Sequence, residues 1–257
     1  MHLHRTSEGN GRESVLVHGF TQTGRSWKPV LDVLGPVGRR TTVDLPGHGW
    51  SGAERADLWR TADLLADVAH AEPGPTTLVG YSLGGRCALH VVLAHPRAIE
   101  RLVLVGATAG IEDEDERAAR VERDETLADR IEQIGVESFL DEWLAQPLFA
   151  GLTEATAGRE ERLVNTPEGL ASSLRLTGTG TQDPLWDRLA EIEVPVLLVA
   201  GEQDERFVAH AQRMAGLLPD AAVAVIPGAG HAAHLEAPVA FVTAWQGWER
   251  SVAARAV

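Results

Sequence analysis

The sequence predicts an α/β protein with a mostly parallel sheet flanked by helices and a helical segment inserted into it. Short apolar runs alternate with stretches of helical spacing as far as residue 109, and this alternation is typical of a parallel sheet. From residue 112 to about 191 the patterns are helical, and strand character then returns. We therefore expect a core of residues 1–109 and 183–257, with a helical lid at residues 110–182 inserted in it.

Apolar runs bounded by turn residues predict the strands, and apolar residues spaced three or four positions apart predict the helices. The stretch after DLPGHGWSG has the helical spacing, with Leu58, Ala62, Leu65 and Ala69 in register. In chain order we expect a strand at 14–18, a helix at 27–34, a strand at 39–43, a helix at 56–71, a strand at 77–80, a helix at 83–94 and a strand at 102–106. After the lid we expect strands at 194–201 and 221–228 and a final helix.

The lid segment carries helical patterns of its own, one on Leu127, Ile131 and Ile134 and the next on 139–144. Thr166 and Asp183 each precede a proline, which predicts two helix starts with N-caps. The acidic run EDEDE at 112–116 is open to two interpretations, a cation site or a solvated helix start. We favour the helix start, because carboxylates suit the positive end of the helix dipole.

The composition is that of a folded protein with an acidic excess. The chain has 257 residues, 44% hydrophobic and 23% charged, and a formal net charge of -14. This charge argues against nucleic-acid partners and against anionic membranes. Cys87 is the single cysteine, so no internal disulfide is possible, and the first residues contain no apolar signal or membrane segment. We expect a cytoplasmic monomer or small homo-oligomer without membrane insertion.

Residues 80–84, GYSLG, place Ser82 between a predicted strand and a predicted helix. G-x-S-x-G in that context predicts a nucleophile elbow, in which the glycines permit a cramped turn that exposes the serine. A serine hydroxyl needs a histidine to accept its proton and an acid to orient that histidine. Asp204 and His231 follow the two late strands in the required order, so Ser82, Asp204 and His231 are the candidate catalytic residues.

These motifs, with His18-Gly19-Phe20 and DLPGHGWS, resemble the α/β-hydrolase superfamily over essentially the whole chain. The resemblance implies an α/β-hydrolase fold. It also implies an oxyanion hole formed by the backbone N–H groups of Phe20 and Leu83. His18, His48 and His234 are more often structural in such loops.

Other interpretations of the same stretch remain open. Residues 80–87 approximate a phosphate-binding loop, but Cys87 stands where a hydroxyl should ligate Mg²⁺. His231 and His234 could both contact a metal, although no carboxylate-histidine cluster accompanies them. A binding protein that senses a ligand without turnover is the third alternative. We expect no metal and no cofactor.

Within the superfamily, the sequence resembles the 2-succinyl-6-hydroxy-2,4-cyclohexadiene-1-carboxylate synthases of menaquinone biosynthesis. The resemblance rests on GYSLGGR, on residues 117–149 and 161–186 of the lid, and on GEQDERF. It implies a lyase that eliminates pyruvate from a succinyl-enolpyruvyl-hydroxycyclohexene carboxylate by triad-assisted proton abstraction. It further implies that this small anionic polycarboxylate is bound by Arg86, Arg120 and Arg162, in a pocket that Tyr81 and Trp143 line.

Some features of the sequence differ from the family pattern or allow more than one assignment. The family tends to have Pro-Gly-Leu at the lid entry and lysine in place of Arg206, whereas this chain has Ala109-Gly110-Ile111. Arg117 and Arg123 lie one turn from Arg120, so any of the three could face the pocket. Arg86 could also extend into solvent. The alternative function is a serine hydrolase, a carboxylesterase or carbon-carbon bond hydrolase acting through an acyl-enzyme.

Overall fold

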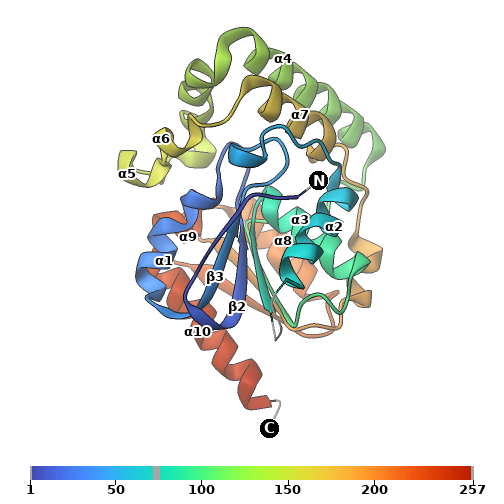
Figure 1. The fold of residues 1–257 in the computed structure, drawn as a ribbon. Helices are drawn as coiled ribbons and strands as arrows, with labels where there is room; N and C mark the ends of the chain where they lie inside the picture. Colours follow the sequence, from blue (N-terminus) through green and yellow to red (C-terminus); the bar gives the residue numbers. More distant parts are fainter. Residues whose placement is uncertain (1, 72–75, 256–257) are drawn as a thin grey trace.

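A seven-stranded sheet in the order β1-β3-β2-β4-β5-β6-β7 forms the centre of the computed structural model, which describes residues 2–71 and 76–255. β1 pairs antiparallel with β3, and every other pairing is parallel. The predicted fold class is therefore confirmed (Figure 1). The strands are β1 (Arg5–Glu8), β2 (Asn10–Val17), β3 (Val37–Val43), β4 (Thr76–Tyr81), β5 (Arg101–Val105), β6 (Val196–Gly201) and β7 (Ala221–Ile226).

Helices cover both faces of the sheet, because alternate side chains of the buried strands point to opposite sides. One face packs on α2 (Leu58–Ala69), α3 (Leu83–Ala94) and α8 (Glu205–Ala215). The other packs on α1 (Lys28–Leu34), α9 (Ala233–Glu236) and α10 (Pro238–Arg255). Short 3₁₀ turns complete the core, η1 (Gly24–Trp27), η2 (Gly49–Ser51) and η4 (Trp186–Glu191).

The chain between β5 and β6 forms a helical cap over one end of the sheet (Figure 1). It contains α4 (Glu114–Leu144), η3 (Pro147–Phe149), α5 (Glu154–Ala157), α6 (Arg159–Arg162) and α7 (Pro167–Thr177). A small apolar cluster that includes Ile131, Phe139, Leu140 and Leu170 joins α4 to α7. The cap therefore has a core of its own, separate from the two beside the sheet.

Of the two helix N-caps that the sequence predicts between β5 and β6, the structure confirms one and contradicts the other. The Thr166 hydroxyl accepts the Gly169 N–H at the start of α7, as predicted. Asp183 caps no helix, so that prediction was wrong: η4 begins at Trp186, without a side-chain cap. The Leu185 N–H instead donates to the Ala109 carbonyl (2.7 Å), which joins the two ends of the inserted segment.

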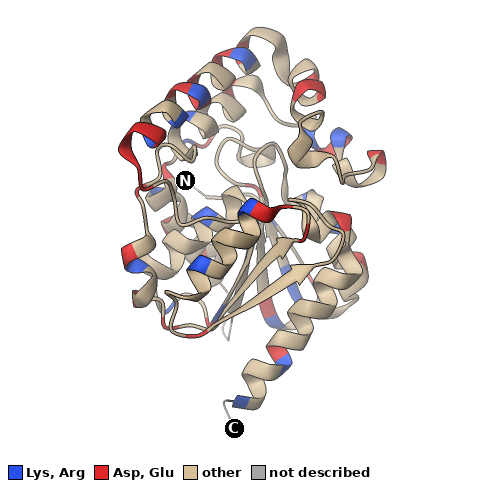
Figure 2. Cartoon of the chain, turned by 180° about the vertical axis from the view of Figure 1, so that it is seen from behind, with Lys and Arg blue, Asp and Glu red and all other residues tan. Residues whose placement is uncertain are grey.

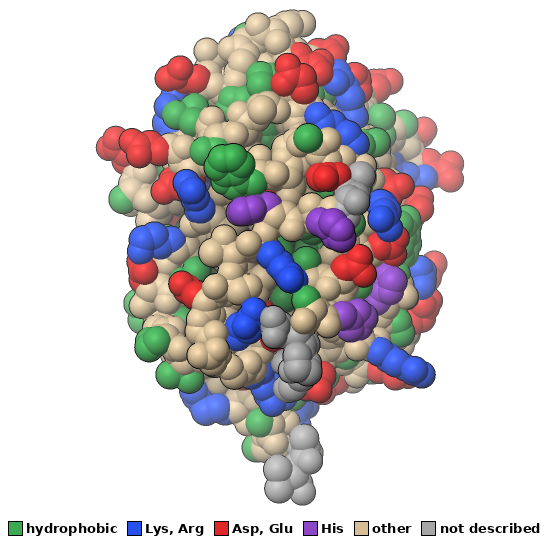
Figure 3. All heavy atoms as spheres, in the orientation of Figure 1, with side chains coloured by type: hydrophobic (Ala, Val, Ile, Leu, Met, Phe, Trp, Pro, Cys, Tyr) green, Lys and Arg blue, Asp and Glu red, His purple; other side chains and the backbone are tan. Residues whose placement is uncertain are grey.

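Charged side chains are distributed over the molecular surface. Acidic and basic residues alternate along the outer side of α4 (Figure 2), and both signs are interspersed on the face in Figure 3. The run at 112–116 is a helix start: the Asp113 carboxylate accepts the Glu116 N–H, and Glu112 pairs with Arg213. Within the part of the chain that the structure describes, no helix is both long and apolar enough to cross a membrane.

Candidate active site

Ser82 occupies a strained turn between β4 and α3. Its φ is 50° and its ψ is -107°, a backbone conformation that costs on the order of 1–3 kcal/mol for a residue other than glycine. The turn is possible because its neighbours lack side chains: a Cβ on Gly84 would lie 2.7 Å from the His18 carbonyl oxygen, and one on Gly80 2.6 Å from the Gly84 carbonyl carbon. Ser82 therefore follows the carboxyl end of the central strand β4, at the end of the sheet that the cap covers.

Ser82, His231 and Asp204 form a hydrogen-bonded chain. His231 Nδ1 lies 2.7 Å from Asp204 Oδ2, and His231 Nε2 lies 3.3 Å from Ser82 Oγ. Because a carboxylate only accepts, the proton of the neutral imidazole is on Nδ1, which leaves Nε2 free to accept the Ser82 hydroxyl proton. The three side chains thus have the relative geometry of a nucleophile, base and orienting acid.

The loops that carry the acid and the base are bonded to each other. Asp204 stands at the start of α8, where its Oδ1 also accepts the Phe207 N–H (3.4 Å). The Gln203 N–H donates to the Ala229 carbonyl across the gap between the two loops (2.9 Å). The Phe207 ring lies 4.5 Å from the His231 ring, centroid to centroid. These contacts fix the two side chains although neither residue belongs to a strand.

The loop after β2 brings Phe20 to the same place. His18 Nδ1 donates to the Gly19 carbonyl (2.8 Å), and His18 Nε2 accepts the Leu45 N–H (3.0 Å). Burial lowers the pKa of His18 to about 4, so the ring stays neutral and can make both bonds. The Gln22 side chain accepts the Gly19 N–H (2.9 Å). The side chains of His18 and Gln22 therefore fix the backbone of this loop by hydrogen bonds.

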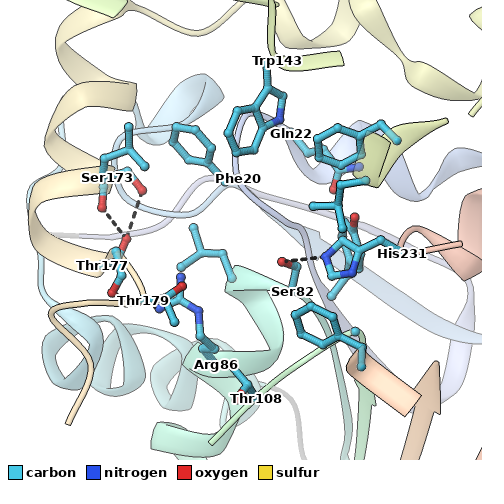
Figure 4. Close-up of a pocket in the computed structure, with 18 of the residues that line it drawn as sticks. Phe20, Gln22, Ser82, Arg86, Thr108, Trp143, Ser173, Thr177, Thr179 and His231 are labelled. Atoms are coloured by element: carbon cyan, nitrogen blue, oxygen red, sulfur yellow. Dashed lines mark hydrogen bonds between the residues drawn. The ribbon is translucent and has the colours of Figure 1, made fainter. Parts of the chain in front are cut away.

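A cavity of about 210 Å³ lies between the cap and the core, and Ser82 and His231 face each other on one wall of it (Figure 4). All ten residues singled out in the sequence line it: Phe20, Tyr81, Ser82, Leu83, Arg86, Arg120, Trp143, Arg162, Asp204 and His231. Leu83 is the first residue of α3, so its backbone N–H is one of those without a partner inside the helix. The structure thus brings together candidates from the core and from two helices of the cap, α4 and α6.

Arg86 lies below the cavity, one helical turn after Ser82 (Figure 4). Its side chain is 7% exposed, so it does not extend into solvent. Its guanidinium donates to the Gly178 carbonyl (3.3 Å) and makes a longer contact with Gln182 (3.5 Å). Burial lowers the pKa of Arg86 to about 10, so the group remains a cation at neutral pH.

Arg162 is the more deeply buried cation, at 2% exposure. It donates to the Ala157 carbonyl (2.7 Å) and to the Thr21 hydroxyl. Burial lowers the pKa of Arg162 to about 10. Within residues 2–71 and 76–255, neither Arg162 nor Arg86 forms an ion pair. In the described part of the chain, two guanidinium charges are therefore held beside the cavity without a carboxylate in direct contact.

Arg120 differs from the other two because it has an acidic partner. Its Nε donates to Asp124 Oδ1 (2.8 Å), one turn along α4. The second Asp124 oxygen is buried and has no hydrogen-bond partner among the residues that the structure describes. Of the neighbouring arginines, Arg117 donates to the Ile111 carbonyl (3.3 Å) and Arg123 is exposed. Arg120 is thus the member of this group that lines the cavity.

Aromatic side chains from both the cap and the core line the cavity. Trp143 packs edge-on to Phe20 across the boundary between cap and core, with ring centroids 5.2 Å apart. Tyr81 lies beside His231, at 5.4 Å, and beside the buried His234, at 4.3 Å. Burial raises the pKa of the Tyr81 hydroxyl, so it is protonated at neutral pH. The cavity therefore combines apolar walls with cations and a neutral hydroxyl.

Several further residues line the cavity that the sequence analysis did not select. They include neutral hydrogen-bonding side chains at its far wall, of which Ser173 and Thr177 are bonded to each other (3.0 Å; Figure 4). Serines and threonines are too common for a single sequence to mark them. These unselected lining residues are Gln22, Gly106, Thr108, Leu148, Phe149, Ser173, Leu174, Thr177, Gly178, Thr179, Arg206 and Phe207.

Comparison with known proteins places the chain among relatives of the same fold. A model of the alpha/beta hydrolase family matches residues 15–244. The structure of MenH from S. aureus has a TM-score of 0.90 and 32% identity, and covers 96% of this chain and 98% of that one. An esterase from Thermogutta terrifontis, with malate bound, has a TM-score of 0.83 and 26% identity, covering 97% and 93%.

Sequence relatives narrow the family. The 2-succinyl-6-hydroxy-2,4-cyclohexadiene-1-carboxylate synthase of Enterobacter sp. (strain 638) is 36% identical over 230 residues, 88% of this chain and 87% of that protein. A Bacillus subtilis (strain 168) protein, provisionally named as the same synthase, is 38% identical over 243 residues, 90% and 88% of the two chains. Since these matches span nearly the full length of both partners, the protein belongs to the alpha/beta hydrolase family and, within it, to the 2-succinyl-6-hydroxy-2,4-cyclohexadiene-1-carboxylate synthases.

Proposed function

We propose that this protein is a lyase that eliminates pyruvate from a cyclohexene carboxylate carrying succinyl, hydroxyl and enolpyruvyl groups. Membership of the synthase family supports the reaction, and the arginines that line the cavity support an anionic substrate. The observation that carries the proposal is the pair of buried guanidinium groups, Arg86 and Arg162, which line the triad's cavity without acidic partners. Burying an unpaired cation is costly, and an anionic ligand offsets that cost.

In this proposal Arg86, Arg120 and Arg162 bind the substrate carboxylates. A guanidinium presents a planar set of donors that matches a carboxylate and stays charged when it is partly desolvated. The three arginines come from α3, α4 and α6, so they surround the cavity rather than share one wall. This local positive charge allows a polyanion to bind to a protein whose net charge is -14. Tyr81 and Trp143 provide the walls on either side.

The proposed chemistry is proton abstraction followed by elimination. The Ser82 oxygen removes a proton from the substrate carbon as its own proton passes to His231, while Asp204 stabilises the imidazolium. The electron pair of the broken C–H bond forms an enolate, which the N–H groups of Phe20 and Leu83 stabilise. The enolate then forms the new ring double bond as the C–O bond to the enolpyruvyl group breaks. The leaving group takes back a proton and departs as pyruvate.

The test offers the purified protein the pyruvate-bearing precursor and a panel of simple esters side by side. We expect pyruvate release without comparable ester turnover, and a strong loss of release in Ser82→Ala, Asp204→Ala and His231→Ala. Mass spectrometry during turnover should find unmodified enzyme, because elimination needs no covalent intermediate. A covalent substrate fragment on Ser82, with ester hydrolysis as the faster reaction, would establish the serine hydrolase instead.

The remaining assignments stay predictions of the sequence. They are a cytoplasmic location, a monomer or small homo-oligomer, no nucleic-acid partner and a reaction without a cofactor. Sedimentation of the purified protein with and without DNA would test the oligomeric state and the nucleic-acid prediction together.

A further inference from the structure

One carboxylate holds the backbone on both sides of His231. The Gly230 N–H donates to Glu236 Oε2 (2.6 Å), and the Ala232 N–H donates to Glu236 Oε1 (3.0 Å). Hydrogen bonds from an N–H to an ionised carboxylate are about twice as strong as bonds between neutral groups. His231 lies in the loop between β7 and α9, outside any strand or helix. Glu236 therefore fixes the two peptide groups from which the His231 side chain projects.

Glu236 has no cation to neutralise it among residues 2–71 and 76–255. The two backbone N–H groups donate to its carboxylate oxygens, and the residue is half-buried. A glutamine in its place would keep one acceptor and turn an NH₂ group, which only donates, toward the other N–H. The two bonds therefore require the ionised carboxylate and not only a side chain of this length.

The helical cap also approaches the Glu236 carboxylate, at Gly151. Gly151 lies between η3 and α5, and a Cβ on Gly151 would overlap the Glu236 carboxylate, whose carbon would be 2.6 Å away. In Figure 1, α5 lies close to α9. Leu148 and Phe149, just before Gly151, line the cavity. The segment that closes the cavity thus contacts the group that holds the catalytic base.

We propose that Glu236 is a positioning residue that keeps His231 aligned with Ser82 and couples this alignment to the closed position of the cap at Gly151. Glu236 touches neither Ser82 nor the cavity, so it acts through the His231 backbone. The inference rests on the proposed triad and not on the identity of the substrate.

The first test is Glu236→Gln, measured by the rate at which a fluorophosphonate labels Ser82. In that reaction the Ser82 oxygen forms a bond to phosphorus, fluoride leaves, and His231 takes the hydroxyl proton. We expect the labelling rate to fall tenfold or more, and kcat for pyruvate release to fall similarly. KM should stay within twofold, since the arginines are untouched.

Glu202→Gln is the matched control. The Glu202 carboxylate accepts the Gly228 N–H (2.9 Å) in the same loop, three residues before His231. This bond does not flank the base, so we expect labelling and kcat within twofold of the parent protein. An equal loss in both variants would mean that any loop carboxylate matters, and would overturn the specific role of Glu236.

The second test leaves Glu236 intact. Gly151 does not have a left-handed backbone conformation, so its backbone tolerates alanine, and Gly151→Ala acts by displacing the carboxylate or the cap. We expect slower labelling of Ser82, and no further loss when Gly151→Ala is added to Glu236→Gln. Labelling within twofold of the parent in both single variants would overturn the proposal. Because labelling needs no substrate, its outcome is independent of whether pyruvate or an ester product is released.

Discussion

Arg86 and Arg162 are two buried cations that line the cavity. Both side chains are less than a tenth exposed, and their bonds go to carbonyls, a side-chain amide and a hydroxyl rather than to carboxylates. Arg120 instead bonds to Asp124 beside the cavity. A substrate carboxylate at Arg120 would compete with Asp124, whereas at the other two positions it would meet an unpaired cation.

We predict that Arg86→Ala, Arg120→Ala and Arg162→Ala each lower kcat/KM for the polycarboxylate substrate by tenfold or more. Removing one partner of a desolvated charge pair costs on the order of 2–5 kcal/mol, and tenfold corresponds to about 1.4 kcal/mol. Steady-state kinetics of pyruvate release measure the effect. Arg123→Ala is the matched control, because Arg123 lies on the same helix as Arg120 but is exposed. Unchanged kinetics in all three pocket variants would contradict the binding role.

At the scale of the element, the long helix of the cap is two helices joined at Gly135. The φ of Gly135 is 77° and its ψ is 168°, a conformation that is essentially restricted to glycine. The break lets Ile131 on one segment and Phe139 and Leu140 on the next reach the same small core. Arg130 and Glu142 pair across the break (2.6 Å). The bend therefore shapes the roof of the cavity.

We predict that Gly135→Ala lowers the free energy of unfolding by about 1–3 kcal/mol, because alanine is strained at this φ and ψ. Helix propensity alone predicts the opposite sign, since alanine in a helix interior is favoured over glycine by about 1 kcal/mol. Gly247→Ala in α10 is the control. Its backbone is not left-handed, and a Cβ there meets only Arg250, at 3.9 Å. Urea unfolding should therefore show destabilisation at 135 and stabilisation at 247; two stabilised variants would contradict the bend.

At the scale of the whole molecule, four buried histidines are neutral in the folded state. Burial lowers the pKa of His18 and His90 to about 4 and of His48 and His234 to about 3, from 6.5. Below pH 6.5 the unfolded chain therefore binds protons that the folded chain does not bind. Stability is retained above that pH and falls as the pH is lowered toward 4.

We predict that His234→Phe makes the protein less sensitive to acid. His234 packs among Trp27, Tyr81 and Phe241, and its Nδ1 is buried without a partner in the described part of the chain. Each such histidine lowers stability by about 1.4 kcal/mol per pH unit below 6.5. Between pH 6.5 and pH 5 the variant should therefore lose on the order of 2 kcal/mol less than the parent protein. Denaturant titrations at both pH values measure this, and equal losses would count against the prediction.

Local patterns were enough to predict most of the core. The helix predicted at 83–94 has those bounds in the structure, and the predicted strands fall within one or two residues of β3, β4, β5 and β6. β1 was not predicted, because its four residues are all exposed and show no apolar alternation. Strand and helix periods are visible in a single sequence since each depends on neighbours a few residues away.

The sequence by itself determined the order of the elements, the Ser82 motif, the positions of Asp204 and His231 and the family to which the chain belongs. Tertiary structure decided what depends on distance between remote segments. It placed Arg120 rather than Arg117 or Arg123 on the cavity, bent α4 at Gly135 and set Glu236 against the His231 loop. A helical pattern spreads side chains around an axis, but only packing against the sheet and cap fixes which of them meet.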